Sequence, residues 1–102
     1  MEHRARNVIG PTVRRLRIAK EFSQQRLAVE CARLGYDLSR GTLAKVEAGI
    51  RAVSDVELFV LAHALNTDVS ELFPAGVLRR IKEGTIAPFH VRGGQSEERE
   101  DR

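Results

Sequence analysis

The chain has 102 residues, enough for one small domain with an extension. Hydrophobic residues make up 42% of the chain and aromatic residues only 5%, so we expect a core of aliphatic side chains. No apolar run approaches the roughly 20 residues of a membrane span, and the first residues lack the apolar segment of a secretory signal. Cys31 is the only cysteine, which excludes a disulfide within the chain. We therefore expect a cytoplasmic protein without membrane attachment.

The net charge of +3 is unevenly distributed. Residues 1–51 contain 11 Lys and Arg against 5 Asp and Glu, a charge of +6. Residues 52–102 contain 6 against 9, a charge of −3. A basic half suggests a polyanionic partner. A solvated basic surface explains the same charge equally well, so charge alone leaves both alternatives open.

Residues 1–7 are basic and predict a flexible arm before the folded domain. A first helix begins at Gly10-Pro11, because proline suits the first turn of a helix. Val13 and Leu16 belong to its inner side, and Arg14 and Arg15 to its outer side.

The second helix begins after Ser23, whose hydroxyl predicts an N-cap, and ends at Gly35. Its apolar residues recur at helical spacing and predict a buried stripe. They are Leu27, Ala28, Cys31 and Leu34. We interpret Cys31 as a small core residue rather than a redox sensor.

The segment from Leu38 to Gly49 carries the clearest signals. Ser39 predicts an N-cap, and Gly49 predicts a left-handed helix end. Leu43 and Val46 point to the core, and four other residues point outward. These outward residues are Arg40, Gly41, Ala44 and Lys45. A small and basic outer face suits a DNA major groove, since it permits close approach and hydrogen bonds to base edges. A plain solvated face is the alternative.

A capping box, Ser54 with Glu57, begins a fourth helix. Its predicted buried stripe is Leu58, Leu61, Ala62 and Leu65, with Asn66 ending the helix. Phe59 and Val60 exceed what this stripe needs. We expect either residues 75–92 or a second chain to cover them.

Asp68 and Glu71 repeat the cap-and-acid pattern for a short fifth helix, which contributes Leu72 and Phe73 to the core. Residues 75–92 form a C-terminal extension and a possible dimerisation element. We expect a short basic helix there, around Val77, Leu78 and Ile81, followed by an extended segment. Residues 93–102 are polar and predict a disordered tail.

Helices in this order resemble the phage-repressor and Cro type of helix-turn-helix domain, the xenobiotic-response-element family of bacterial regulators. The matching segments are 13–20, 22–28, 39–49, 61–65 and 69–73. The resemblance implies a compact all-α, five-helix domain over residues 8–74. It also implies a structural ion pair between Arg17 in the first helix and Glu47 at the end of the third.

The resemblance further implies that Gln24, directly after the cap of the second helix, contacts a DNA phosphate. On the third helix, we expect Arg40 and Lys45 to contact base edges or phosphates, and Thr42 a phosphate. The complete predicted DNA-binding set is Gln24, Gln25, Ser39, Arg40, Gly41, Thr42, Lys45 and Arg51. Arg51, in the loop after the third helix, is expected to contact backbone phosphate.

One departure concerns the connection between the second and third helices. Ser39 lies 11 positions after Ala28, where the compact family pattern has about six. The direction of the third helix therefore cannot be carried over from the resemblance. Tyr36 lies in this insertion, with a packing role favoured over a phosphate contact.

His3, His63 and His90 share no metal-ligand spacing with each other or with Cys31. The sequence shows no nucleophile–base arrangement and no phosphate-binding glycine loop, so we expect no metal, no cofactor and no enzymatic activity. These observations predict a regulator that binds double-stranded DNA, acts as a repressor by operator occlusion and forms a homodimer through its fourth and fifth helices and residues 75–92. The alternative is an antitoxin or adaptor, whose main partner is a toxin or co-regulator protein.

Overall fold

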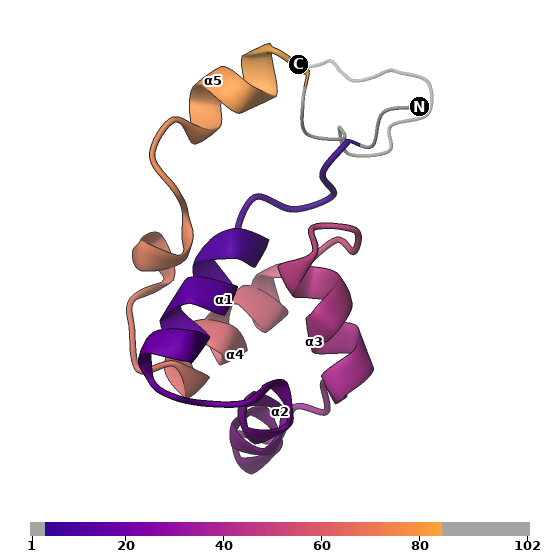
Figure 1. Cartoon of the computed structure of the whole chain (residues 1–102), viewed down its shortest axis with the longest axis vertical. Coiled ribbons are helices and arrows are strands. Elements are labelled where there is room, and N and C mark those ends of the chain that lie inside the picture. The colour runs from indigo at the N-terminus through magenta and orange to yellow at the C-terminus, as the bar shows by residue number, and fades with distance from the viewer. Residues whose placement is uncertain (1–3, 85–102) are drawn as a thin grey trace, which may run out of the picture.

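The structure, a computed structural model, describes residues 4–84 and is helical (Figure 1). Its elements are α1 (Gly10–Ala19), α2 (Gln24–Arg33), α3 (Arg40–Glu47), α4 (Asp55–Ala64), the 3-10 helix η1 (Val69–Leu72) and α5 (Val77–Lys82). The predicted all-α fold is confirmed. The fifth helix of the domain is the single turn η1, and the predicted basic helix of the extension is α5.

Three serines begin three helices, as their positions in the sequence predict. The hydroxyls of Ser23, Ser39 and Ser54 each accept a hydrogen bond from the backbone N–H three residues later. Each bond satisfies a donor that the first turn of a helix leaves without a partner. Gly49 ends the α3 turn with φ of 78°, a conformation that glycine adopts without a steric penalty. Local chemistry therefore sets the boundaries of these helices.

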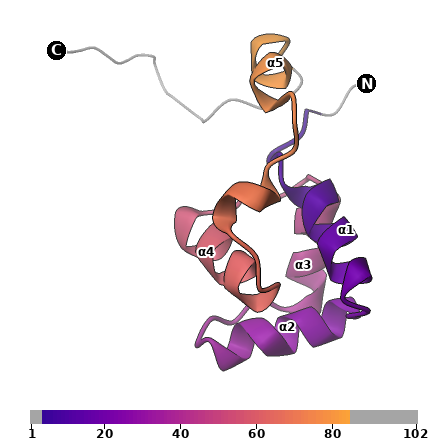
Figure 2. The ribbon, with the colours of Figure 1, turned by 90° about the vertical axis from the view of Figure 1, so that its left-hand side faces the viewer.

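The core lies where α1 to α4 meet, and η1 closes one side of it (Figure 2). It is aliphatic, as the composition predicts. Its fully buried side chains are Ile9, Val13, Leu27, Cys31, Leu43, Val46, Leu61 and Leu72. Val13 of α1, Leu27 of α2 and Leu43 of α3 are all 0% exposed, so these three helices are fixed against one another.

Four predictions about apolar residues need correction. Val60 is buried within its own chain at 8% exposure, whereas Leu58 is only partly buried. Phe73 is 40% exposed, because it follows the end of a 3-10 helix in extended backbone, next to the buried Leu72. Leu34 is 46% exposed, because it lies at the end of α2, beyond the core.

Asp68 does not cap η1 with its side chain. The side chain of Glu71 instead accepts a hydrogen bond from the hydroxyl of Thr67. The repeated cap-and-acid pattern therefore marks the right place in the chain but the wrong hydrogen bond.

The boundary of the predicted arm also moves. Arg6 N–H donates to the carbonyl of Gly49 at 2.7 Å. The amide nitrogen of Asn7 donates to the carbonyls of Val46 at 3.0 Å and Arg51 at 2.9 Å. Its amide oxygen accepts from the N–H groups of Ile9 and Gly10. Asn7 thus belongs to the domain and joins the start of α1 to the end of α3.

The extension begins after Pro74 and carries α5 away from the four-helix body (Figures 1 and 2). None of the residues of α5 is buried. The extended segment predicted after α5 and the polar tail lie outside the described residues.

Candidate nucleic-acid interface

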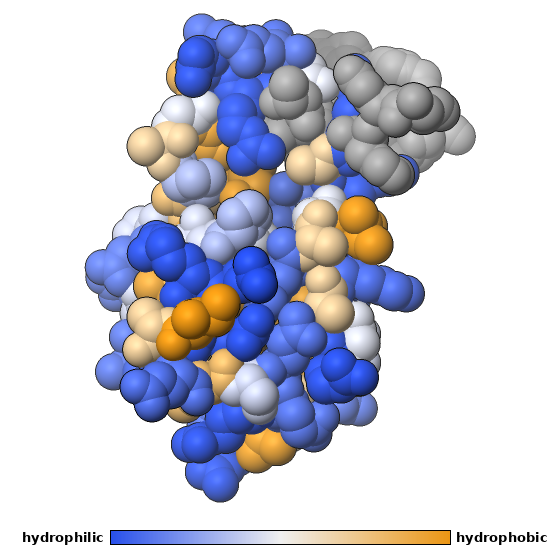
Figure 3. Space-filling view, viewed as in Figure 1, coloured by the Kyte–Doolittle hydropathy of each residue, from blue (hydrophilic) through white to orange (hydrophobic). Residues whose placement is uncertain are grey.

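Helix α3 has two different faces. Leu43 and Val46 are 0% and 1% exposed and hold the helix to the core. Arg40, Gly41 and Lys45 are exposed on its outer side, and Ala44 beside them is half-buried. The surface over α1 and α3 in Figure 3 is largely hydrophilic. The outer face of α3 is therefore basic at two positions and carries small residues between them.

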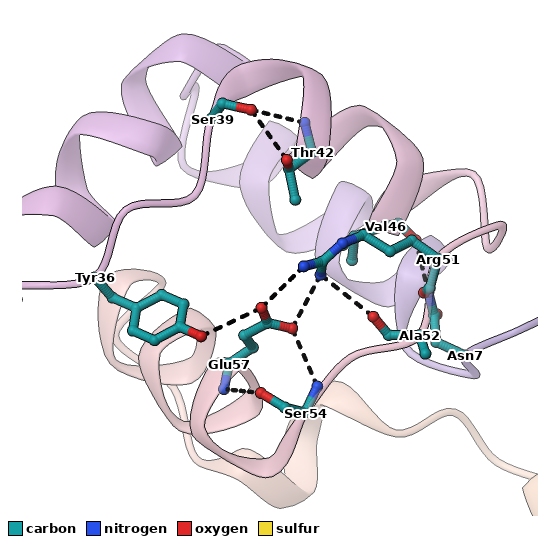
Figure 4. Close-up of polar contacts among 9 residues, drawn as sticks. All are labelled: Asn7, Tyr36, Ser39, Thr42, Val46, Arg51, Ala52, Ser54 and Glu57. Atoms are coloured by element: carbon teal, nitrogen blue, oxygen red, sulfur yellow. Dashed lines mark hydrogen bonds and ion pairs between the residues drawn. The ribbon is translucent and has the colours of Figure 1, made fainter. Parts of the chain in front are cut away.

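The hydroxyls of Ser39 and Thr42 form a small network at the start of α3 (Figure 4). Ser39 Oγ accepts from the backbone N–H of Thr42 at 3.1 Å and lies 3.0 Å from Thr42 Oγ1, to which it donates. The Ser39 hydroxyl is therefore engaged in capping. The Thr42 hydroxyl accepts in this network and keeps its own hydrogen for another acceptor.

An ion pair between Arg17 and Glu47 joins α1 to the last residue of α3. Arg17 Nε lies 2.6 Å from Glu47 Oε2, and Arg17 Nη2 lies 3.0 Å from Oε1. The side chains are 11% and 4% exposed, and Arg17 Nη1 also donates to the carbonyl of Phe22. The hydrogen bonds that Arg17 donates to Glu47 raise the pKa of Arg17, against the opposing effect of burial. This two-bonded pair fixes both the position and the rotation of the end of α3.

Gln24 lies beside the same carboxylate. Its amide nitrogen donates to Glu47 Oε1 at 3.1 Å, so the start of α2 meets the end of α3. The primary amide has a second hydrogen that this bond does not use. Gln25, the next residue, is exposed. The structure therefore brings Gln24 close to the end of α3 and leaves Gln25 exposed to solvent.

Arg51 has a partner that the sequence did not indicate (Figure 4). Its Nη1 and Nη2 donate to the two carboxylate oxygens of Glu57, at 2.9 and 3.1 Å. Nη1 also donates to the carbonyl of Ala52. The Arg51 bond is the main reason that the pKa of Glu57 is lowered, while burial opposes the shift. The expected phosphate ligand is thus engaged within the loop that follows α3.

Glu57 has two roles, of which the sequence indicated one. The predicted capping box is present, since Glu57 Oε1 accepts from the N–H of Ser54 at 3.1 Å and Ser54 Oγ accepts from the N–H of Glu57. The same carboxylate also accepts from the hydroxyl of Tyr36 at 3.4 Å. One buried carboxylate therefore connects α4, the loop after α3 and the insertion before it.

This connection explains how the longer turn between α2 and α3 is accommodated. Tyr36 packs against the core, and Leu38 is 3% exposed. The insertion is therefore held at two places. Leu38 is buried just before the start of α3, and Tyr36 donates a hydrogen bond to Glu57 on α4. The packing role favoured for Tyr36 agrees with this geometry.

Arg14 and Arg15 lie on the exposed side of α1, close to the end of α3. With Pro11, Ile18 and Glu47 they line a shallow hollow of about 480 Å³. The hollow is open, and only the two arginines give it a basic character.

Other functional sites find no support in the part of the chain that the structure describes. Residues 4–84 contain no group of three or more His, Cys, Asp or Glu side chains that could hold a metal ion. None of their helices is long and apolar enough to cross a membrane. Burial raises the pKa of the Cys31 thiol to about 11, which disfavours the reactive thiolate.

Comparison with known proteins agrees with this arrangement. A family model described as helix-turn-helix matches residues 13–72. A crystal structure of the restriction-modification controller protein C.AhdI from Aeromonas hydrophila is similar, with 40% sequence identity and a TM-score of 0.57. The match covers 64% of this chain and 87% of that chain. No curated protein matches the sequence.

Proposed function

Because the chain belongs to the Cro/C1-type helix-turn-helix family of DNA-binding transcriptional regulators, we propose that it is a repressor that binds its operator through α3. One observation carries the proposal. The exposed Arg40 and Lys45 lie on a helix whose position is fixed by the buried pair of Arg17 and Glu47. A recognition helix needs both an outer face that bonds to bases and a rigid attachment behind it.

In this proposal, α3 enters the major groove. Arg40 and Lys45 donate to base edges, for which guanine O6 and N7 are the preferred acceptors. Gly41 and Ala44 permit the close approach, because their side chains add little between the helix and the groove floor. The free hydrogen of the Thr42 hydroxyl donates to a phosphate oxygen.

The flanking contacts come from the start of α2. Gln24, held by Glu47, donates its second amide hydrogen to a phosphate, and the exposed Gln25 adds a second contact. We assign Arg51 to fixing the loop after α3 rather than to direct phosphate binding, because Glu57 neutralises its charge. Ser39 likewise contributes by capping α3.

Repression follows from occupancy, since bound protein blocks polymerase at the operator. We infer that two copies act together as a homodimer, because a single domain of this kind reads one half-site and coupling two half-sites raises affinity. The likeness to a restriction-modification controller protein supports a regulatory role.

The proposal is tested by fluorescence anisotropy with a mixed-sequence duplex at low and moderate salt. We expect binding to this duplex to weaken as the salt concentration rises. On a duplex that carries the operator, Arg40→Ala and Lys45→Ala should each weaken binding about 10- to 100-fold, because each variant removes a contact to a base. The matched control is Lys20→Ala with Arg33→Ala, which removes two exposed cations outside α3. Equal binding by the wild type and an Arg40→Ala/Lys45→Ala variant would exclude α3 as the DNA-binding element and favour the protein-partner alternative.

A further inference from the structure

Helix α5 has an apolar side that the described residues, 4–84, leave uncovered. Leu78 and Ile81 are 61% and 55% exposed and lie three residues apart, on one side of the helix. A helix of six residues is marginal in water unless a tertiary contact covers its apolar face. Helix α5 therefore needs a surface to pack on.

Helix α4 presents such a surface on its outer side. Val56 is 53% and Phe59 is 60% exposed, and the spacing of three residues places them together. The ring of His63 continues this stripe, with its centroid 5.3 Å from that of Phe59. Two apolar surfaces of one chain are thus both exposed.

The charges around the two surfaces are opposite. The sequence has no Lys or Arg between Arg51 and Arg79. Asp55, Asp68 and Glu71 are exposed on α4 and on the segment that follows it. Helix α5 instead carries Arg79 and Lys82, with Arg80 as a third cation. Opposite charge around paired apolar surfaces favours association in one orientation.

In both views α5 lies apart from α4 of its own chain (Figures 1 and 2). It also lies beyond residue 72, where the match to the family model ends. We propose that α5 of each copy packs on the Val56–Phe59 face of α4 in a second copy. Two such reciprocal contacts close a two-fold dimer. The proposal rests on the dimeric repressor proposed above and names the surface that joins the copies.

The first test is sedimentation equilibrium of the full chain across a concentration series. We expect a wild-type dimer, and a dimer dissociation constant raised at least about tenfold by Leu78→Ser with Ile81→Ser, or by Phe59→Ser. The matched control, Ile18→Ser with Leu34→Ser, removes comparably exposed apolar side chains from α1 and α2 and should leave the mass unchanged. A monomeric wild type, or an α5 variant that remains as dimeric as the wild type, would overturn the proposal.

A second test distinguishes a dimer in which α5 of each copy packs on α4 of the other from a dimer in which like surfaces face each other. The α5 double variant keeps an intact α4 face, and the Phe59 variant keeps an intact α5. Mixing the two should give a weak heterodimer at concentrations where each variant alone is monomeric. In this heterodimer one α5–α4 contact is intact, between the α5 of the Phe59 variant and the α4 face of the α5 variant. Failure of the mixture to associate, together with dimeric wild type, would indicate a face-to-face contact of like surfaces and contradict the exchange.

DNA titrations separate this proposal from the function itself. We expect the monomeric α5 variant to retain salt-sensitive binding to a short mixed-sequence duplex. Loss of duplex binding by Arg79→Ala with Lys82→Ala, at unchanged dimer mass, would assign these cations to DNA and contradict their pairing with α4. If the wild type binds no duplex, the repressor proposal fails whatever the mass measurements give.

Discussion

Two arginine–glutamate pairs lie on either side of the end of α3, and they differ in burial. In the pair of Arg17 and Glu47 the side chains are 11% and 4% exposed, whereas in the pair of Arg51 and Glu57 they are 35% and 9% exposed. The first joins the body of the domain to α3 itself. The second joins α4 to the loop that follows α3. The protein therefore fixes α3 from within the core and shapes the adjoining loop nearer to solvent.

The buried pair should give the largest effect. Glu47→Ala leaves the guanidinium of Arg17 in a buried site without its carboxylate, and it also removes the acceptor of Gln24. We expect a loss of about 3–5 kcal/mol in the free energy of unfolding, measured by urea denaturation. A loss below about 1 kcal/mol would mean that the pair behaves as a surface pair and does not fix α3.

Gly10 tests the same junction without changing a charge. A Cβ atom at this position would lie 2.4 Å from the carbonyl oxygen of Val46 and 2.8 Å from that of Glu47. Gly10→Ala should therefore push α1 away from α3 and cost about 1–3 kcal/mol of stability. Gly41→Ala is the matched control, because a Cβ there meets only Ser39 Oγ, at 3.9 Å. Equal stabilities of the two variants would contradict the close contact.

The less buried pair, Arg51 with Glu57, should give a smaller and pH-dependent effect. Glu57→Gln loses the charge that pairs with Arg51, and we expect a loss of about 1–2 kcal/mol near neutral pH. The pKa of Glu57 is lowered in the folded state, so its contribution is present above its ordinary value of 4.5 and is lost as the pH falls through the lowered pKa.

Urea denaturation at several pH values checks this sign. The difference in stability between the wild type and Glu57→Gln should shrink as the solution is acidified below pH about 4.5. Because the other carboxylates are common to both proteins, their titration cancels in the difference. A difference that grows in acid would show that Glu57 is not held as a carboxylate by Arg51.

A third pair, on the surface of α2, should give the smallest effect. Arg26 Nε lies 2.7 Å from Glu30 Oε2, but the arginine side chain is 54% exposed. Solvent screens such a pair, and holding two long side chains in place offsets much of the gain. Glu30→Gln should unfold at a urea concentration indistinguishable from that of the wild type. A marked shift would show that burial does not separate the strong pairs from the weak one.

The same contrast between local and distant contacts explains what the sequence predicts. Ser39 and Gly49 mark the start and the end of α3 correctly, because a cap and a left-handed turn depend on neighbouring residues. The side chain of Asn7 bonds to the carbonyl of Val46, which lies 39 positions later in the chain, and to that of Arg51, which lies 44 positions later. No local pattern indicates them, so the sequence assigns Asn7 to an arm.

Glu57 shows how one local signal can hide another role. Its capping box is readable from four neighbouring residues and already accounts for a glutamate at this position. Arg51 and Tyr36 reach its carboxylate only once the loop and the insertion fold over α4. The resemblance to a family, rather than spacing, predicts the pair of Arg17 and Glu47, and the structure contains it. The apolar side chain of Phe73 predicts a core position, but the 3-10 turn before it directs only Leu72 inward.

We infer that DNA contacts the outer face of α3 and the start of α2. The most direct measurement is a series of ¹H–¹⁵N NMR spectra of the full chain during addition of an unlabelled duplex. We expect the largest amide shifts on residues 24–25 and 40–45, and we expect these shifts to be absent from the spectra of an Arg40→Ala/Lys45→Ala variant. Shifts confined to α5, or their persistence in that variant, would contradict it.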